Sequence, residues 1–295
     1  MSIVSVDLMG GLGNQLFQIF AAFAYAIEHN KKLIFPYEEV LHKGKSRPTY
    51  WKNFLNTLSI FTTANTANGV SNSELFSLCD QYQWLEHHYS PIPFFSQNIL
   101  LRGYFQSPKY FQEYESQIIR MMHIEEMKYA LKEEYAMFFT NEPGNIKGLY
   151  TISMHFRMGD YKGNPCHPVL KYEYYVNALT LISSVVNTMS MNIRVLYFCE
   201  KEDNDIVNSI IERLKEDCFI LDFIKVGDEV ADWKQILLMS LCDSQIIANS
   251  TFSWWGAYFA KKGNMVCYPD GWFSGPLLSH NMSDMFLEEW IKIIY

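Results

Sequence analysis

The chain has 295 residues, 49% of them apolar and 19% charged, which indicates a globular protein with room for two ordinary domains or one large one. Its net charge of −8 argues against nucleic-acid binding, because that activity relies on clustered Lys and Arg. No apolar run is long enough to span a membrane and no signal-peptide core is visible, so we expect a cytoplasmic protein, with peripheral membrane association left open.

The first predicted elements are a strand over residues 3–8, a glycine loop and a helix. The loop reads Gly10-Gly-Leu-Gly-Asn14, and apolar residues then recur at spacings of three and four, so we expect Asn14 to be the N-cap. This arrangement points backbone N–H groups and the positive end of a helix dipole at an anion. It is not a dinucleotide fingerprint, because Leu16 stands where the third glycine would be. A tight turn without a ligand is the alternative.

The rest of the first half is less regular. Residues 41–75 give no clear pattern, and a long helical pattern follows residue 108 and ends near residue 139. Further strands are expected at residues 32–35, 82–87 and 100–105. The turn formers of residues 141–148 favour a linker, so we predict an N-terminal domain over residues 1–145 and a C-terminal domain over 146–295.

Strands and helices alternate clearly in the second half. This βαβ pattern predicts a parallel, doubly wound sheet. Residues 284–295 are compatible with a helix that packs on either domain. The expected strands are 149–156, 193–199, 219–226, 245–249 and 264–268, and the expected helices are 172–187, 204–216, 232–242 and 251–261.

The strand at 149–156 runs into the motif His155-Phe-Arg-Met-Gly-Asp160. Side chains alternate along a strand, so His155 and Arg157 should share a face. An imidazole beside a guanidinium at a strand end suggests an anionic ligand, most simply a phosphate. Asp160, just past the turn, could hold a hydroxyl group or accept a proton.

A second polar cluster follows the strand at 245–249. Asn249, Ser250, Thr251 and Ser253 precede or begin a helix, where hydroxyl groups can cap the helix or donate to a phosphate. One hydroxyl would be enough for a cap, so the cluster favours a phosphate site. The paired tryptophans Trp254 and Trp255 that follow are expected in the core.

A third polar stretch follows the strand at 193–199. Glu200 lies nearest the strand end and could accept hydrogen bonds from a ribose or a base. Asp203 and Asp205 have the spacing of a metal-binding motif, but acidic residues also favour the first turn of a helix, and we prefer that interpretation. The six cysteines have no zinc-ligand spacing, and their scattered distribution suits a reducing compartment.

Strand ends at 10–14, 155–160 and 249–253 therefore carry groups suited to an anion. Two α/β domains that face each other across a cleft would bring these strand ends around one ligand. We accordingly predict a nucleotide diphosphate bound at a domain interface.

Four stretches of the chain form a recognisable set: Gly10-Gly-Leu-Gly-Asn-Gln-Leu-Phe-Gln18, Gly103-Tyr-Phe-Gln-Ser-Pro-Lys-Tyr-Phe111, His155-Phe-Arg-Met-Gly-Asp-Tyr161 and Ile247-Ala-Asn-Ser-Thr-Phe-Ser-Trp-Trp-Gly-Ala-Tyr258. Through these stretches the chain resembles the α-1,2-fucosyltransferases of glycosyltransferase family 11 over nearly its whole length. The resemblance implies a GT-B fold, with two Rossmann-like domains facing across a nucleotide-sugar cleft, and a metal-independent, cofactor-free, inverting transfer of L-fucose. The donor would be GDP-fucose and the acceptor the 2-hydroxyl of a β-galactoside in a surface glycan.

The family pattern also implies roles for individual residues. Arg157 matches the arginine that binds the β-phosphate of GDP. For the base that activates the acceptor, our own first choice from the residues is Asp160 and the second is His155. Glu200 stands at an acidic position of the family. The remaining residues implied in GDP-fucose binding are Gly11, Gly13 and Asn14 of the glycine motif and Asn249, Ser250, Thr251 and Phe252 of the last motif.

Two positions depart from the family pattern. Met158 replaces the second arginine of His-x-Arg-Arg-x-Asp, although strand alternation should point it away from Arg157. Gln235 replaces a frequent aspartate, for which Asp232 one turn earlier could substitute. The alternatives are a transferase of the same fold with another donor sugar, a non-catalytic GDP-sugar binding module and, more distantly, a nicotinamide oxidoreductase.

Overall fold

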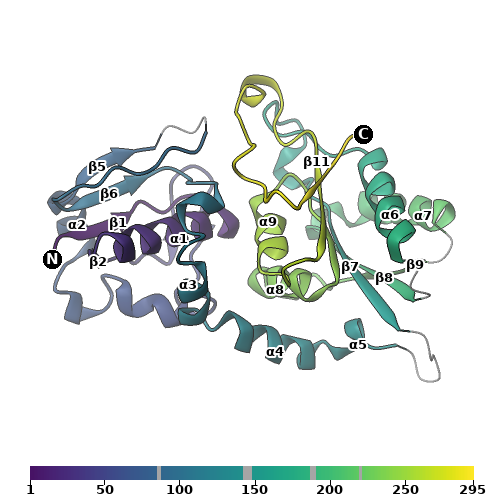
Figure 1. Ribbon diagram of the computed structural model, residues 1–295, viewed down its shortest axis with the longest axis horizontal. Helices are drawn as coiled ribbons and strands as arrows, with labels where there is room; N and C mark the ends of the chain where they lie inside the picture. The colour runs from purple at the N-terminus through teal and green to yellow at the C-terminus, as the bar shows by residue number, and fades with distance from the viewer. Residues whose placement is uncertain (85–87, 142–147, 187–190, 219–220) are drawn as a thin grey trace. The chain divides into compact units, whose positions relative to one another are not determined.

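The computed structural model describes residues 1–84, 88–141, 148–186, 191–218 and 221–295. The chain forms two compact units, Met1–Glu125 with His280–Leu287 and Glu126–Ser279 with Glu288–Tyr295 (Figure 1). Each unit contains a parallel sheet with helices, which confirms the predicted α/β fold class of GT-B type. The predicted boundary at residue 145 falls inside the second unit by this division, and residues 142–147 of the expected linker lie outside the described residues.

The first unit is built on a four-stranded sheet with the order β2-β1-β6-β5, in which all neighbours are parallel. Helix α1 (Leu12–Glu28) buries 14 of its 17 residues, as expected of a helix that is apolar on nearly every side. The strands are β1 (Ile3–Val6), β2 (Lys32–Leu33), β5 (Asp80–Gln83) and β6 (Ile99–Arg102). They confirm the expected strands with shorter bounds, and residues 85–87 of one expected strand lie outside the described residues.

Short elements occupy the region that had no clear sequence pattern. Strands β3 (Val40–Leu41) and β4 (Arg47–Pro48) form an antiparallel pair, and α2 (Asn72–Leu78) begins with a capping box between Ser71 and Glu74. Two 3-10 helices, η1 (Asn56–Phe61) and η2 (Thr66–Asn68), follow β4 and precede α2 in the chain.

The long helical pattern after residue 108 is divided into four pieces, so the expectation of one continuous helix was wrong. Residue His123, with a φ of 57°, ends α3 because a left-handed residue cannot continue the helix. The pieces are η3 (Pro108–Tyr110), α3 (Glu115–Met121), α4 (Ile124–Glu134) and α5 (Ala136–Phe139).

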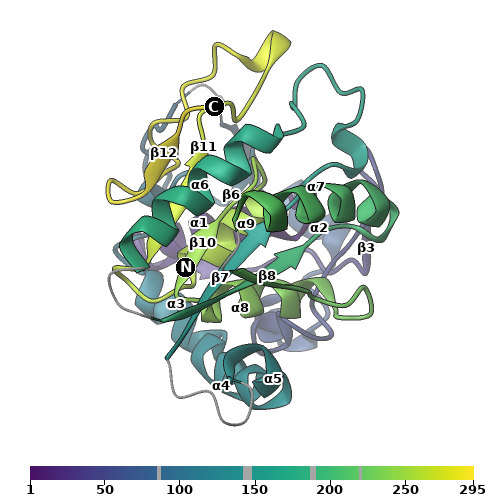
Figure 2. The ribbon, with the colours of Figure 1, turned by 90° about the vertical axis from the view of Figure 1, so that its right-hand side faces the viewer.

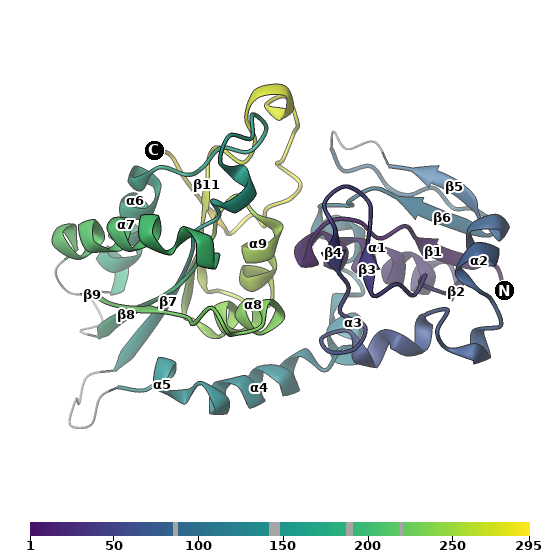
Figure 3. The same cartoon turned by 180° about the vertical axis from the view of Figure 1, so that it is seen from behind.

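The second unit has a six-stranded sheet, β12-β11-β10-β7-β8-β9, and every neighbouring pair is parallel. Helices α6 and α7 cover one face of this sheet (Figure 2), and α8 and α9 cover the other (Figure 3). The strands are β7 (Leu149–His155), β8 (Asn192–Phe198), β9 (Leu221–Lys225), β10 (Ser244–Ile246), β11 (Met265–Pro269) and β12 (Ile291–Ile293), and the helices are α6 (Tyr172–Val186), α7 (Asn204–Asp217), α8 (Asp232–Leu241) and α9 (Thr251–Tyr258). The doubly wound sheet is therefore confirmed, and residues 187 and 219–220 of two expected elements lie outside the described residues.

The C-terminal segment is not a helix. Residues 291–293 form β12, which pairs with β11 through Cys267 and Ile291, and Ile293 is buried while Lys292 is exposed, as strand alternation requires. Residues 280–287 belong to the first unit, where Ser107 Oγ donates to the carbonyl oxygen of Asp284 at 2.6 Å.

The order of the second sheet has a switch point between β7 and β10. From β7 the chain moves outward to β8 and β9, whereas from β10 it moves outward in the other direction to β11 and β12. Met154 near the end of β7 is the register partner of Ile246 at the end of β10. Open α/β sheets bind ligands outside the carboxyl ends of their strands at such a point. Within the described residues, no helix has the length and apolar character needed to cross a membrane.

Candidate functional site

The motif at 155–160 lies at the carboxyl end of β7, beside the switch point. Residues Ile152, Met154, Phe156 and Met158 all belong to the apolar core of the second unit. This alternation confirms that Met158, only 3% exposed, faces away from Arg157. The side chain that replaces the second arginine of the family pattern is therefore part of the core.

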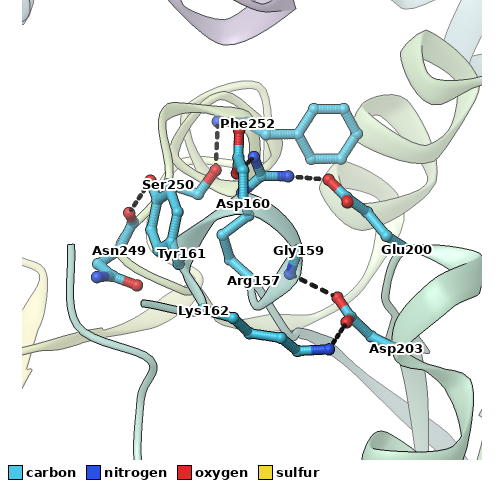
Figure 4. Close-up of polar contacts among 10 residues, drawn as sticks. All are labelled: Arg157, Gly159, Asp160, Tyr161, Lys162, Glu200, Asp203, Asn249, Ser250 and Phe252. Atoms are coloured by element: carbon cyan, nitrogen blue, oxygen red, sulfur yellow. Dashed lines mark hydrogen bonds and ion pairs between the residues drawn. The ribbon is translucent and has the colours of Figure 1, made fainter. Parts of the chain in front are cut away.

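The guanidinium of Arg157 is held by two carboxylates and one aromatic ring (Figure 4). Its Nη1 donates to Oε1 of Glu200 and its Nη2 donates to Oδ1 of Asp160. The guanidinium carbon also lies 5.0 Å from the ring centroid of Tyr161. Burial opposes the charge of Arg157, but Glu200 and Asp160 outweigh it and raise the pKa of Arg157. Arg157 thus stays cationic while its side chain is only 16% exposed.

The loop that carries Arg157 is attached to the segment after β8 through Asp203. This carboxylate is fully buried; it accepts a hydrogen bond from Gly159 N at 2.7 Å and pairs with Lys162 Nζ at 2.6 Å (Figure 4). Gly159 has a φ of +20°, and a Cβ atom at this position would collide with the carboxylate of Glu200. No local sequence pattern indicates this role of Asp203, because it depends on the adjacency of β7 and β8.

The same contacts bear on the metal-binding interpretation of Asp203 and Asp205. Both oxygens of Asp203 are engaged by the protein, and Asp205 lies in the first turn of α7. Among the residues that the structure describes, no group of three or more His, Cys, Asp or Glu is arranged to hold a metal ion. Metal independence of the reaction stays a prediction.

The polar cluster after β10 serves mainly to build the turn. Ser250 is the N-cap of α9 and accepts a hydrogen bond from Phe252 N at 3.3 Å, while Ser253 Oγ accepts one from Ala248 N at 3.1 Å. Asn249 is 1% exposed, and its Nδ2 donates to the carbonyl of Pro168 at 2.9 Å. Thr251 and Phe252 are half-buried at the start of α9.

Trp254 and Trp255 are fully buried, which confirms that both belong to the core. Gln235, at the other position that departs from the family pattern, donates to the carbonyl of Val230 at 2.8 Å. Asp232 begins α8.

Two contacts join the motif after β7 to the turn after β10. Tyr161 Oη donates to the carbonyl oxygen of Asn249 at 3.0 Å, and the ring centroids of His155 and Phe252 are 5.5 Å apart. The structure therefore brings together the sequence-predicted residues of these two strand ends, and Glu200 joins them through Arg157. Tyr161 was not predicted as a site residue, although it directly follows Asp160 in the sequence.

His155 is a buried, uncharged group. Its residue is 7% exposed, and burial together with the nearby charge of Arg157 lowers the pKa of His155 to about 3. Its Nδ1 atom has no hydrogen-bond partner among the described residues. A side chain with this pKa accepts protons poorly near neutral pH, so the physical argument favours Asp160 over His155 as the base.

The glycine loop of the first unit precedes α1, but Asn14 is not its N-cap. The helix begins at Leu12, so Gly11 is the N-cap, and it has no side chain that could cap the helix. The carbonyl oxygen of Gly11 accepts a hydrogen bond from Gln15 N at 3.0 Å. Gly13 is buried in the first turn. The prediction of Asn14 as N-cap placed the helix start too late.

Asn14 instead links the glycine loop to the segment after β6. Its Oδ1 accepts a hydrogen bond from Gln106 Nε2 at 3.0 Å, and a Cβ atom added to Gly10 would lie 2.6 Å from Asn14 Nδ2. Gln18 binds the loop from the helix side, with both a donor and an acceptor contact to the backbone of Met9. The glycine at position 10, with a φ of +78°, is therefore needed for both conformation and space.

Comparison with known proteins identifies the family of this chain. The family model described as "Glycosyl transferase family 11" matches residues 6–294. An alpha-1,2-colitosyltransferase from Escherichia coli is 25% identical over 99% of this chain and 99% of its own length, and a galactoside 2-alpha-L-fucosyltransferase from Caenorhabditis elegans is 24% identical over 96% and 77%. The solved structure of a family 9 glycosyl transferase from Veillonella parvula has a similar fold, with a TM-score of 0.51 and 11% identity over 99% of this chain and 86% of that one. The chain belongs to glycosyl transferase family 11, and the protein is a glycosyltransferase.

Proposed function

We propose that the protein transfers L-fucose from GDP-fucose to the 2-hydroxyl of a galactose residue, with inversion to an α-1,2 linkage. The observation that carries this proposal is Arg157, a largely buried cation at the switch point of the second sheet. It follows His155 by two residues in the chain, and the ring of His155 lies 5.5 Å from that of Phe252 at the start of α9. A nucleotide diphosphate is the ligand that such a cation and a helix N-terminus suit best. The names of the two relatives support an α-1,2 deoxysugar transfer.

In the proposed complex Arg157 binds the β-phosphate of GDP. Its planar guanidinium can bind two phosphate oxygens at once, which a lysine cannot do. Ser250, Thr251 and Phe252 form the first turn of α9 and its cap, where backbone N–H groups and the helix dipole favour the same anion. Glu200 would accept hydrogen bonds from the ribose or the base. Gly11, Gly13 and Asn14 of the first unit are proposed to contact the diphosphate.

The transfer itself exchanges one bond at the anomeric carbon of fucose. The acceptor oxygen bonds to this carbon as its bond to GDP breaks, and GDP leaves with the electron pair. Arg157 stabilises the charge that develops on the leaving phosphate, a contribution of about 3–4 kcal/mol for a well-placed donor. Asp160, exposed beside Arg157, would take the proton of the acceptor hydroxyl. No metal or other cofactor is required in this scheme.

A donor other than GDP-fucose is the second candidate, because one relative carries the name of a colitosyltransferase. The assay that decides is transfer from GDP-fucose to a panel of β-galactosides, with GDP-mannose and UDP-sugars as competitors. We expect transfer from GDP-fucose to at least one galactoside, competition by GDP-linked but not UDP-linked sugars, and no loss of rate with EDTA.

Three results would contradict this proposal in different ways. Transfer only from another GDP-sugar would replace the donor and leave the rest intact. A loss of activity with EDTA that Mg²⁺ or Mn²⁺ restores would overturn metal independence. Calorimetric binding of GDP without turnover on any acceptor would favour a non-catalytic binding module.

A further inference from the structure

We propose that Asp203 is a positioning residue, which holds the loop that presents Arg157 and Asp160. This inference rests on the proposed function, because it assigns Asp203 to the donor site through Arg157. Asp203 itself contacts neither reacting group of the proposed reaction. It acts through the backbone of Gly159, which lies between the two functional residues in the chain.

The carboxylate of Asp203 is buried, and its hydrogen-bond partners compensate the free-energy cost of that burial. It is 0% exposed, and a buried carboxylate is unfavourable unless the protein satisfies it. Its two oxygens have one partner each, Gly159 N at 2.7 Å and Lys162 Nζ at 2.6 Å. Both partners belong to the loop after β7, so these two contacts tie the buried carboxylate to the loop that it holds. Its position at the N-cap of α7 adds the favourable interaction with the helix dipole.

The loop needs such an attachment because regular pairing ends before Arg157. Strand β7 stops at His155, and the last backbone contact that continues its pairing with β8 is Phe156 N to Phe198 O at 2.8 Å. Asp203 lies in the 3-10 helix η6 (Lys201–Asp203) that follows β8. The hydrogen bond from Gly159 therefore extends the β7–β8 connection past the end of the strands.

The position of the Gly159 backbone also controls the space around Arg157. At Gly159 a Cβ atom would collide with the carboxylate of Glu200, the same group that binds Arg157 Nη1. A shift of the loop at Gly159 would consequently change the distance from Arg157 to both Glu200 and Asp160. Displacement of a catalytic group by about 1 Å can cost about a hundredfold in rate.

The test compares Asp203→Asn with three other variants of the full chain. An asparagine of the same shape can accept from Gly159 N or from Lys162, but its amide group then faces the other donor. Lys162→Met removes only the charged partner. Asp222→Asn is the control, because it also removes a carboxylate that pairs with a cation, Arg194, at 2.7 Å. This pair lies near the amino ends of β8 and β9, away from the carboxyl ends of the strands where Arg157 and Asp160 lie. The fourth protein combines Asp203→Asn with Arg157→Ala.

We expect Asp203→Asn to lower kcat/KM for GDP-fucose by about a hundredfold, with the KM of the acceptor and the melting temperature close to wild type. Lys162→Met should lower kcat/KM for GDP-fucose by a smaller factor than Asp203→Asn, and Asp222→Asn should keep wild-type kinetics. Because Asp203 acts through Arg157, its substitution should change the rate little further in the Arg157→Ala protein. Effects of Asp203→Asn and Arg157→Ala that multiply would overturn the inference, since they would show independent roles.

Hydrogen exchange of the ligand-free protein gives a readout that does not depend on the reaction. The amides of residues 157–162 should exchange faster in Asp203→Asn than in wild type and Asp222→Asn. Unchanged exchange there would overturn the inference even if the transferase activity is present. If exchange is faster in Asp203→Asn but the wild-type protein binds no GDP-sugar, the loop attachment is supported and the proposed function is contradicted.

Discussion

The carboxylate of Glu200 binds the guanidinium of Arg157, the group proposed to hold the donor diphosphate. Asp160 binds the other terminal nitrogen of the same guanidinium. A diphosphate that binds Arg157 competes with these two carboxylates for the same positive charge, although the guanidinium has five N–H donors and these two bonds use only two of them. This competition separates the roles of the three side chains and makes them testable one at a time.

The first prediction concerns Arg157 itself. Arg157→Ala should lower kcat/KM for GDP-fucose by about a hundredfold or more, because a charge that develops on the leaving group loses its main partner. Arg157→Lys should fall between this variant and wild type, since lysine keeps the charge but not the planar fork. Steady-state kinetics with variable GDP-fucose measure both. Near-normal turnover of Arg157→Ala would remove the proposed role.

The second prediction uses Glu200→Gln to compare two ligands. With the competing carboxylate removed, inorganic pyrophosphate should bind up to about fivefold more tightly, the effect of one exposed ion pair. GDP should not gain the same factor, because the glutamine replaces the proposed acceptor of the ribose or base. Isothermal titration calorimetry at constant ionic strength measures both affinities. An equal gain for the two ligands would show that Glu200 makes no contact with the nucleoside.

The third prediction tests Asp160 as the base. Asp160→Asn keeps an oxygen that can accept from Arg157 but removes the proton acceptor, so GDP affinity should stay near wild type while kcat falls about a hundredfold. The measurement is kcat across the pH range together with the affinity for GDP. Full activity at every pH would mean that another group, or none, takes the proton.

The fourth prediction follows from the burial of His155. Its pKa in the folded protein is about 3, below the value of about 6.5 in an unfolded chain, so between these values only the unfolded state binds the proton. Its contribution to stability is therefore complete above about pH 6.5 and falls as the pH drops toward 3, by about 1.4 kcal/mol per pH unit within that window.

Urea unfolding of wild type and His155→Gln at several pH values measures this contribution. The two stability curves should diverge as the pH falls below about 6, with wild type losing more. Parallel curves would show that His155 is protonated as easily in the folded protein as in the unfolded one.

The fifth prediction concerns Met158. Because this side chain is 3% exposed in the core, Met158→Arg should restore the residue type of the family pattern but destabilise the fold by about 3 kcal/mol, the cost of an uncompensated buried charge. Met158→Leu, a swap of similar volume, should cost less than about 1.5 kcal/mol. Unfolding free energies measure both, with GDP affinity as a second readout. A stable Met158→Arg protein with tighter GDP binding would show that residue 158 can reach the donor.

The local features of this protein could be predicted from its amino-acid sequence. Apolar runs and helical patterns located the strands and helices of the second unit apart from β12, because such patterns depend only on neighbours within a few residues. They also put Met158 on the face opposite Arg157, and the anion-suited groups at His155, Arg157 and Asn249 were visible as residue types at strand ends. The adjacent tryptophans Trp254 and Trp255 were correctly predicted to lie in the core.

Which strand ends are neighbours could be seen only once the strands were paired in the folded protein. That β7 lies between β10 and β8 depends on pairing over about ninety residues of chain, which no local pattern encodes. The contacts of Arg157 with Glu200, of Gly159 with Asp203 and of Tyr161 with Asn249 all follow from that order. For the same reason the last strand escaped prediction: residues 291–293 are too few to show a period, and pairing with β11 makes them a strand.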